Sequence, residues 1–179
     1  MRPEELLPSL EELPGLLQRV VDGLVEGDLR RRPAVGGWAV VEQAWHLADL
    51  EAEGYGVRIE RLLVEEDPEL PDFDGETAAK VRRYESLDAA RGASRFRLAR
   101  AANLARLRGV HGATWGRPGR QEGLGPVELG HLPRMMRDHD RSHAHQLADL
   151  LAEIEPGHPA LPALRALAGS APSGSAHAD

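Results

Sequence analysis

Apolar side chains recur at alternating three- and four-residue intervals along most of this chain, and the two-residue alternation of a strand is almost absent. This spacing places apolar residues on one face of a helix, so it predicts an all-α protein with four long helices. The apolar positions of the first helix are Leu6, Leu10, Leu13, Leu17, Val20 and Leu24. We expect that helix to kink or restart at Pro14, because proline removes a helical donor, and to end near Gly27.

The second helix is predicted over residues 38–65, before the prolines that follow it. Residues 66–76 are rich in proline and acidic side chains, which indicates a long surface loop. Residues 77–83 are expected to form a helical turn within the same connection to the third helix. The third helix is predicted to begin at residues 86–88 (Ser-Leu-Asp), a stretch that offers a plausible N-cap, and to end at Gly109. So long a connection between helices 2 and 3 favours a crossover between non-adjacent or parallel helices.

The fourth helix is expected to contain Pro126 in its first turn, after a glycine-rich loop. Its apolar face has two histidines in it, four residues apart: the face comprises Leu129, Leu132, Met136, His139, His143, Leu147, Leu150 and Ile154. The sequence therefore predicts two imidazoles in the core.

Histidines at positions i and i+4 of a helix point to one side, so both rings can reach one divalent cation at about 2.0–2.1 Å. A third ligand must come from another helix, and His46 in the second helix is the candidate. Three protein ligands with one open position are typical of a catalytic metal site, whereas a structural zinc site closes with four. Two alternatives to a metal site remain for these histidines: a structural, hydrogen-bonded role in the core, and a pair that occurs by chance on the surface. The flanking leucines favour the metal site over a surface pair.

The second helix has two apolar stripes, and His46 lies on only one of them. A helix that is apolar on two sides is either central in its bundle or shared with a partner subunit. The second alternative predicts a homodimer.

The composition fits one soluble domain of 179 residues with a net charge of −7. Lys80 is the only lysine and aromatic residues are few, so we expect no nucleic-acid partner. No apolar run approaches the roughly 18–20 residues of a membrane span, and the first residues do not form a signal peptide, so the protein is expected to be cytoplasmic with no membrane partner. The single lysine, the lack of cysteine and the lack of a Gly-rich phosphate loop argue against Schiff-base enzymes, thiol proteases and P-loop enzymes.

One domain followed by a short extension is predicted along the chain. Residues 1–155 form the four-helix bundle, and residues 156–179 form a short C-terminal extension that is partly disordered. A short docked helix is expected at 160–168 within that extension.

Three stretches of the chain carry a family resemblance. They are residues 37–49 (GWAVVEQAWHLAD), residues 124–129 (LGPVEL) and residues 139–146 (HDRSHAHQ). Over roughly residues 5–155 the chain resembles the DinB/YfiT-like superfamily of four-helix-bundle metal-binding proteins. In that superfamily a Trp-rich start of the second helix leads into His-Leu-Ala-Asp, and the last helix carries His-x-x-x-His-x-x-Gln. The resemblance implies a four-helix bundle of DinB/YfiT-like type with a long crossover between helices 2 and 3.

The resemblance also implies that His46, His139 and His143 are the metal ligands, with water in the open position. Nickel or zinc is the expected ion, with iron and manganese as alternatives. Family members of known chemistry use a low-molecular-weight thiol such as mycothiol or bacillithiol, so such a thiol and a small-molecule substrate are the expected partners. The related sulfoxide synthases place a glutamate two residues after the second histidine, where this chain has His145.

Ligating histidines usually donate their second ring N–H to a nearby acceptor, so four polar residues are candidates to orient the rings: Asp49, Gln146, Glu42 and Glu53. Each is equally consistent with an exposed polar residue. The predicted function is a metal-dependent transferase that uses a thiol, or a hydrolase. The alternatives are a noncatalytic metal-binding or stress-associated bundle and a purely structural bundle.

Overall fold

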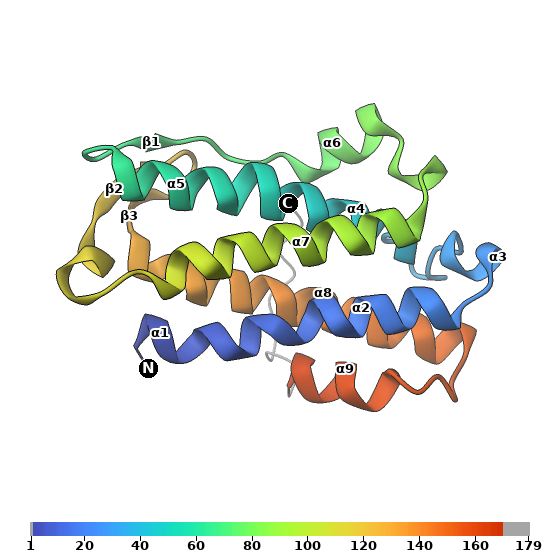
Figure 1. The fold of residues 1–179 in the computed structure, drawn as a ribbon. Coiled ribbons are helices and arrows are strands. Elements are labelled where there is room, and N and C mark those ends of the chain that lie inside the picture. The colour runs from blue at the N-terminus through green and yellow to red at the C-terminus, as the bar shows by residue number, and fades with distance from the viewer. Residues whose placement is uncertain (1, 170–179) are drawn as a thin grey trace.

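Four long helical segments lie side by side in the computed structural model, which describes residues 2–169 (Figure 1). The first comprises α1 (Pro3–Leu6), the 3-10 turn η1 (Leu7–Glu11) and α2 (Glu12–Gly23). The second comprises α4 (Val40–Asp49), the π-helical segment η2 (Leu50–Tyr55) and α5 (Gly56–Val64). The third is α7 (Ala89–Arg108) and the fourth is α8 (Leu132–Ile154). The predicted four-helix bundle is confirmed.

The first segment restarts as an α-helix just before Pro14, which lies in the first turn of α2. Proline has no N–H to donate to the carbonyl four residues earlier, which here belongs to Leu10. The buried guanidinium of Arg100 in α7 donates to that carbonyl from Nη1 at 2.8 Å. The expected interruption at Pro14 therefore also attaches the first helical segment to α7.

A wide turn interrupts the second helix between α4 and α5, in the π-helical segment η2. In a π-helix the backbone bonds run from i to i+5, so the normal i to i+4 bonds are lost locally. Asn103 Nδ2 in α7 donates to the Glu51 carbonyl at 2.8 Å and to the Glu51 carboxylate at 2.8 Å. π-bulges occur frequently at functional sites, and this one begins four residues after His46.

The crossover from the second helix to the third contains β1 (Glu69–Leu70), α6 (Gly75–Arg82) and the turn η3 (Tyr84–Ser86). Asp74 caps α6 by accepting a hydrogen bond from the Thr77 N–H at 2.8 Å. At the start of α7, within the stretch predicted to contain the N-cap, Asp88 accepts from the Arg91 N–H at 2.7 Å. The long crossover and the third helix are thus as predicted.

A small three-stranded sheet covers one end of the bundle (Figure 1). β1 pairs in parallel with β2 (Pro118–Gln121), and β2 pairs antiparallel with β3 (Gly125–Glu128). Strands of two to four residues are too short to show an alternating pattern in the sequence. The prediction that Pro126 begins the fourth helix is wrong: Pro126 lies in the edge strand β3, and Pro133 occupies the first turn of α8. An edge strand tolerates proline because its outward N–H has no partner.

Three shorter elements complete the description. They are α3 (Glu26–Leu29) after the first segment, the turn η4 (Gly112–Gly116) before the sheet, and the turn η5 (Leu129–His131), which leads into α8.

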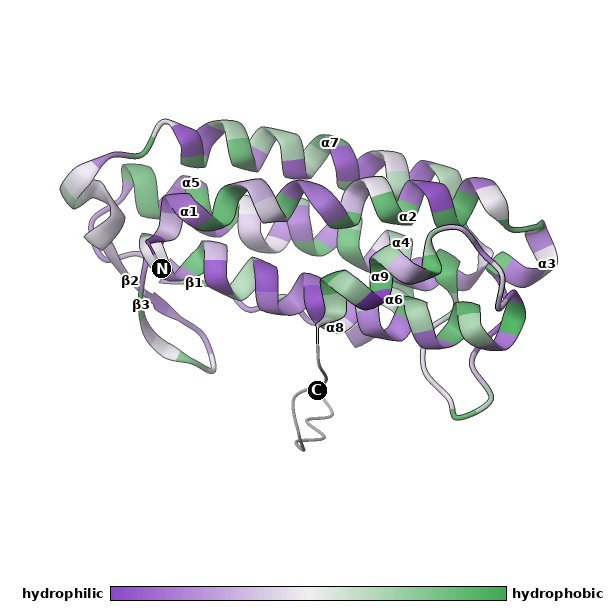
Figure 2. Cartoon of the chain, turned by 90° about the horizontal axis from the view of Figure 1, so that it is seen from below, coloured by the Kyte–Doolittle hydropathy of each residue, from purple (hydrophilic) through white to green (hydrophobic). Residues whose placement is uncertain are grey.

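Two apolar clusters fill the bundle, with a layer of polar residues between them. One cluster includes Leu17, Trp45 and Leu147, and the other includes Leu10, Ile59 and Met136. The polar layer is buried and lies between the clusters along the second, third and fourth helices: it comprises His46, Asp49, Glu51, Arg100, Asn103, Asp140 and His143. Figure 2 shows that each long helix mixes hydrophobic and hydrophilic residues along its length. Buried polar groups must find partners, so this layer is where specific chemistry is expected.

In the first half of the second helix, contacts within this one chain account for both apolar stripes. All ten residues of α4 are buried, including Val41 and His46. Further along, the stripe that includes Val64 reaches the surface, where that side chain is 73% exposed. The first half of the helix, α4, is therefore central in its bundle, and the homodimer stays a prediction.

Residues 161–168 form α9 (Leu161–Ala168), the short helix expected in the C-terminal extension. Its buried residues Leu161 and Leu164 join the apolar cluster that contains Trp45. The disorder predicted for the end of the extension falls on residues 170–179, which lie outside the described residues. Across residues 2–169, none of the helices is both long enough and apolar enough to span a bilayer.

Candidate metal centre

Three imidazoles converge from two helices. His46 comes from α4, and His139 and His143 come from successive turns of α8. One ring nitrogen from each lies within 4.8 Å of the others. The Nε2 atoms of His46 and His139 are 3.3 Å apart. Two ligands held about 2.05 Å from a tetrahedral ion are separated by about 3.3 Å, so this pair already has the spacing that a metal would require.

Burial keeps these imidazoles uncharged at neutral pH. Desolvation lowers the pKa of His46 from 6.5 to about 4, although the nearby Asp49 carboxylate acts in the opposite direction. Desolvation, then the proximity of His46 and Arg100, lowers the pKa of His139 to about 3. Desolvation also brings the pKa of His143 well below its ordinary value. Neutral imidazole is the form that binds a metal, so the site needs no deprotonation to do so.

A glutamine that the sequence analysis did not single out orients His143. The Nδ1–H of His143 donates to Gln43 Oε1 at 3.1 Å, and Gln43 Nε2 donates to the Trp38 carbonyl at 3.2 Å. This bond leaves His143 Nε2 as the acceptor nitrogen that a cation would use. Gln43 precedes His46 by three residues on the same helix, so the helical spacing that identified Asp49 also pointed to it.

The four residues expected to orient the rings have other partners. Glu42 accepts from the backbone N–H of Ala39 at 2.9 Å and from Arg32. Glu53 accepts from Arg82 at 2.8 Å. Gln146 is exposed and lies 3.5 Å from Ser142 Oγ. None of the hydrogen bonds found for these three residues in the described chain joins an imidazole.

Asp49 is the buried member of that set, and it anchors α6 rather than a histidine. Its Oδ2 atom accepts from Tyr84 Oη at 2.6 Å and from Arg82 Nη1 at 2.5 Å. Because Arg82 ends α6, this carboxylate holds the crossover against α4 one turn beyond His46.

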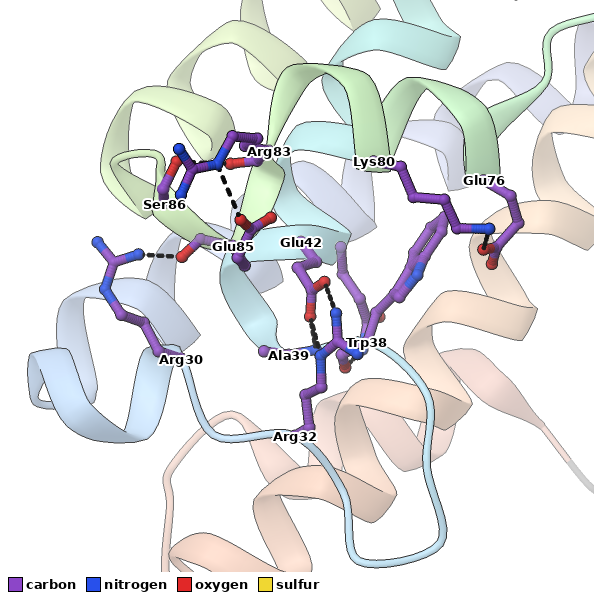
Figure 3. Close-up of polar contacts among 11 residues, drawn as sticks. Arg30, Arg32, Trp38, Ala39, Glu42, Glu76, Lys80, Arg83, Glu85 and Ser86 are labelled. Carbon is purple, nitrogen blue, oxygen red and sulfur yellow. Dashed lines mark hydrogen bonds and ion pairs between the residues drawn. The ribbon is translucent and has the colours of Figure 1, made fainter.

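A cavity of about 930 Å³ opens onto the three histidines. Its walls come from the loop before α4, the start of α6 and one face of α8. The ring of Trp38 lies 4.6 Å from that of His46, centroid to centroid. Figure 3 shows Trp38 on the loop that leads into α4, next to the contact of Arg32 with Glu42. This volume is large enough for a small-molecule ligand.

Gly75, the first residue of α6, lies directly against His46. A Cβ added to Gly75 would sit 2.5 Å from His46 Cε1 and 2.6 Å from Nδ1. That nitrogen is buried without a hydrogen-bond partner among the described residues, so on this side the ring is positioned by packing.

Gly75→Ala is therefore expected to displace His46 and weaken divalent-metal binding by about tenfold, measured by competition with a chromogenic chelator. Gly15→Ala is the matched control, because Gly15 is exposed in α2 and has no atom within 4 Å of an added Cβ. The control should leave metal binding unchanged and raise stability by about 0.5–1 kcal/mol. Equal metal affinity in the two variants would contradict this role of Gly75.

The metal-free protein is expected to lose stability as the pH falls from 6.5 towards 4. Over this range the histidines of the unfolded chain take up protons, whereas the pKa of His46 in the fold has dropped to about 4. The unfolded state then binds more protons, and the free energy of unfolding falls by about 1.4 kcal/mol per pH unit for each such imidazole. Urea unfolding at several pH values in the presence of a chelator measures the slope. A variant with all three histidines changed to glutamine should show a clearly smaller slope, and identical slopes would refute the assignment.

Comparison with known proteins agrees with this architecture. Residues 9–147 match the family model of the DinB superfamily. A protein of Bacillus licheniformis named "Putative metal-dependent hydrolase" is 34% identical over 85 residues, which cover 48% of each chain. A protein of the same name from Oceanobacillus iheyensis is 31% identical over 80 residues, covering 45% of this chain and 46% of its own. The matches thus span about half the length of these curated relatives.

A solved structure has the same fold. YfiT from Bacillus subtilis, described as "a probable metal-dependent hydrolase with an unusual four-helix bundle topology", superimposes with a TM-score of 0.77. The similarity covers 85% of this chain and 87% of YfiT at 20% sequence identity. At that identity the likeness establishes the fold.

Proposed function

This chain belongs to the DinB superfamily, and on that premise we propose that it binds a divalent metal ion through His46, His139 and His143 and uses it for catalysis. The reaction is hydrolysis or the transfer of a small thiol. An ion held by three neutral imidazoles keeps its full charge and would lower the pKa of a water or thiol at the open position.

The observation that carries the proposal is the convergence of three uncharged imidazoles, two buried and that of His139 half-buried, in the lining of an open cavity. Two ring nitrogens 3.3 Å apart in a partly buried site, with no carboxylate bonded to them in the described structure, are satisfied together by one cation. His143 is already fixed by Gln43 in the tautomer that ligation needs. A hydrogen-bonded core histidine explains one such ring, but not three around a common centre.

The relatives favour hydrolysis as the first reaction to test, since two carry the name of a metal-dependent hydrolase. Thiol transfer rests on the family resemblance and on the acidity that a bound thiol would gain. An all-nitrogen donor set is suited to nickel, zinc or iron, with manganese less favoured. The second candidate, a noncatalytic metal-binding bundle, keeps the same site without turnover.

The test is a turnover screen of untagged protein loaded in turn with zinc, nickel, iron and manganese. The substrates are nitrophenyl esters for hydrolysis, and monochlorobimane with mercaptoethanol for thiol transfer. We expect turnover with at least one ion, saturating at one equivalent, and loss of that turnover in His143→Ala with the helical circular dichroism retained. Full metal occupancy with no turnover for any combination of ion and substrate would favour the noncatalytic candidate.

A further inference from the structure

The imidazole of His46 is covered on one side by α6, the helix of the crossover. Gly75, the first residue of α6, packs so closely against the ring that an added Cβ would lie 2.6 Å from Nδ1. That nitrogen is buried without a hydrogen-bond partner among the described residues, so no bond of its own fixes the ring on this side. The orientation of His46 therefore depends on where α6 lies.

Apolar packing attaches α6 only weakly to the bundle. Ala79 is the buried residue among its eight, and the half-buried Ala78 packs against the same apolar cluster. An alanine side chain is a single methyl group, so each contributes little apolar area. Val81, the larger apolar residue of this helix, is 76% exposed. A helix with so small an apolar contact needs a further attachment.

Arg82, the last residue of α6, supplies that attachment. Its guanidinium donates to the buried carboxylate of Asp49 at 2.5 Å and to both carboxylate oxygens of Glu53 at 2.8 Å. Asp49 belongs to α4 and Glu53 to η2, so the contact joins α6 to the second helix. The ion pair of Lys80 with Glu76, by contrast, stays within α6.

The two contacts between α6 and α4 are coupled through the helices that carry them. His46 and Asp49 are three residues apart on α4, so they lie on the same side of that helix. Gly75 and Arg82 are the two ends of α6, about two helical turns apart. The ionic contact at one end of α6 therefore determines how closely Gly75 approaches His46 at the other end.

We propose that Arg82 is a positioning residue for the metal ligand His46 and acts on it through α6. The inference rests on the proposed function in one respect, because it takes His46 as a ligand. Tyr84 also bonds to Asp49, but the left-handed residue Arg83 separates Tyr84 from the helix. Tyr84 therefore fixes the turn that follows α6, whereas Arg82 fixes the helix itself.

Arg82→Gln tests the proposal, and the first measurement is made on metal-free protein. Asp49 keeps Tyr84 and Arg95 as partners, at 2.6 and 3.5 Å, so we expect the fold to survive. The Cε1–H of His46 should exchange with deuterium about threefold faster, measured by mass spectrometry, because Gly75 covers that carbon less closely. The affinity for zinc, measured by competition with a chromogenic chelator, should fall about fivefold.

Arg83→Gln is the matched control. Arg83 is exposed, follows Arg82 directly and pairs with Glu85 rather than with the second helix (Figure 3). This variant should leave both the exchange rate and the zinc affinity at their wild-type values. Glu53→Gln removes one half of the Arg82 contact from an exposed position, so it should change both quantities in the same direction as Arg82→Gln, but by less.

A double variant separates a positioning role from a general loss of stability. Gly75→Ala alone is expected to press on His46 and to weaken zinc binding about tenfold. If Arg82 acts through α6, its removal lets the helix move back and relieves that pressure. The double variant Gly75→Ala, Arg82→Gln should then bind zinc no more weakly than Gly75→Ala, whereas independent effects would multiply to about fiftyfold.

Two results would overturn the proposal: losses of affinity that multiply in the double variant, and a rate of deuterium exchange at His46 that is the same in Arg82→Gln as in Arg83→Gln. A wild-type protein that binds no zinc would instead count against the proposed metal site. The exchange experiment needs no metal, so it would still decide the role of Arg82 in that case.

Discussion

Arg100→Met is expected to lower the free energy of unfolding by about 3–5 kcal/mol, because it leaves two buried carboxylates without their cation. Arg100, Glu51 and Asp140 are each at most 2% exposed. Arg100 donates to both oxygens of Asp140 at 2.7 and 2.9 Å, and its Nη2 lies 2.9 Å from Glu51 Oε2. The same guanidinium holds the Leu10 carbonyl that Pro14 leaves free. One side chain therefore joins the first, second and fourth helical segments to α7.

Two features distinguish this effect from a simple loss of packing. Burial raises the pKa of Glu51 and Asp140, and Arg100 opposes that rise. Without Arg100 the carboxyls can be accommodated only by taking up protons, so the destabilisation should shrink as the pH falls. Adding Glu51→Gln and Asp140→Asn should likewise recover part of the stability.

Urea unfolding of wild type and variants at pH 5 and pH 7.5 measures these differences. Arg97→Met is the matched control, since Arg97 is exposed on the same helix, and it should change stability by no more than about 0.5 kcal/mol. A loss below about 1 kcal/mol in Arg100→Met, or a loss independent of pH, would contradict the account of the polar layer.

His143→Ala is expected to abolish metal binding at micromolar concentrations, the second large effect. His143 is 4% exposed and its Nδ1 is already bonded to Gln43, so its removal takes away a preoriented ligand and leaves Gln43 Oε1 without its donor. Two imidazoles alone form an incomplete site. Isothermal titration with zinc and nickel measures the loss directly.

His145→Ala is the control on the same helix. His145 is exposed and lies near Asp149, away from the imidazole centre, so this variant should bind metal as wild type does. Gln43→Leu should fall between the two, with a loss of about 10–100-fold, because the ligand remains but its orientation is lost. Equal affinity of wild type and His143→Ala would show that metal binds elsewhere.

The sequence predicted the long helices and the pair His139 and His143 because both depend on local spacing, whereas the choice of His46 rested on the family resemblance. His139 and His143 share a helical face with Leu132 and Leu147, and that pattern needs no knowledge of other segments. The start of the third helix at residues 86–88 was predicted for the same reason. These features follow from the geometry of one helix.

The features that the sequence did not predict depend on contacts between distant segments. Arg100 reaches Asp140 and Leu10 across forty and ninety positions, and no periodicity connects them. The short strands pair only because the bundle brings residues 69–70 to residues 118–121. Asp49 has the helical spacing of a ring-orienting residue, but Arg82 and Tyr84 of the crossover occupy it instead. Local spacing identifies which residues can meet, and tertiary contacts decide which do.

The central claim is that the three imidazoles hold a metal ion, and the metal content of untagged protein purified without chelator tests it most directly. Elemental mass spectrometry is applied to wild type and to the triple variant His46→Ala, His139→Ala, His143→Ala. The account predicts close to one equivalent of a divalent transition metal in wild type and none in the variant. Wild-type protein that stays free of metal after reconstitution with nickel, zinc, iron and manganese would contradict it.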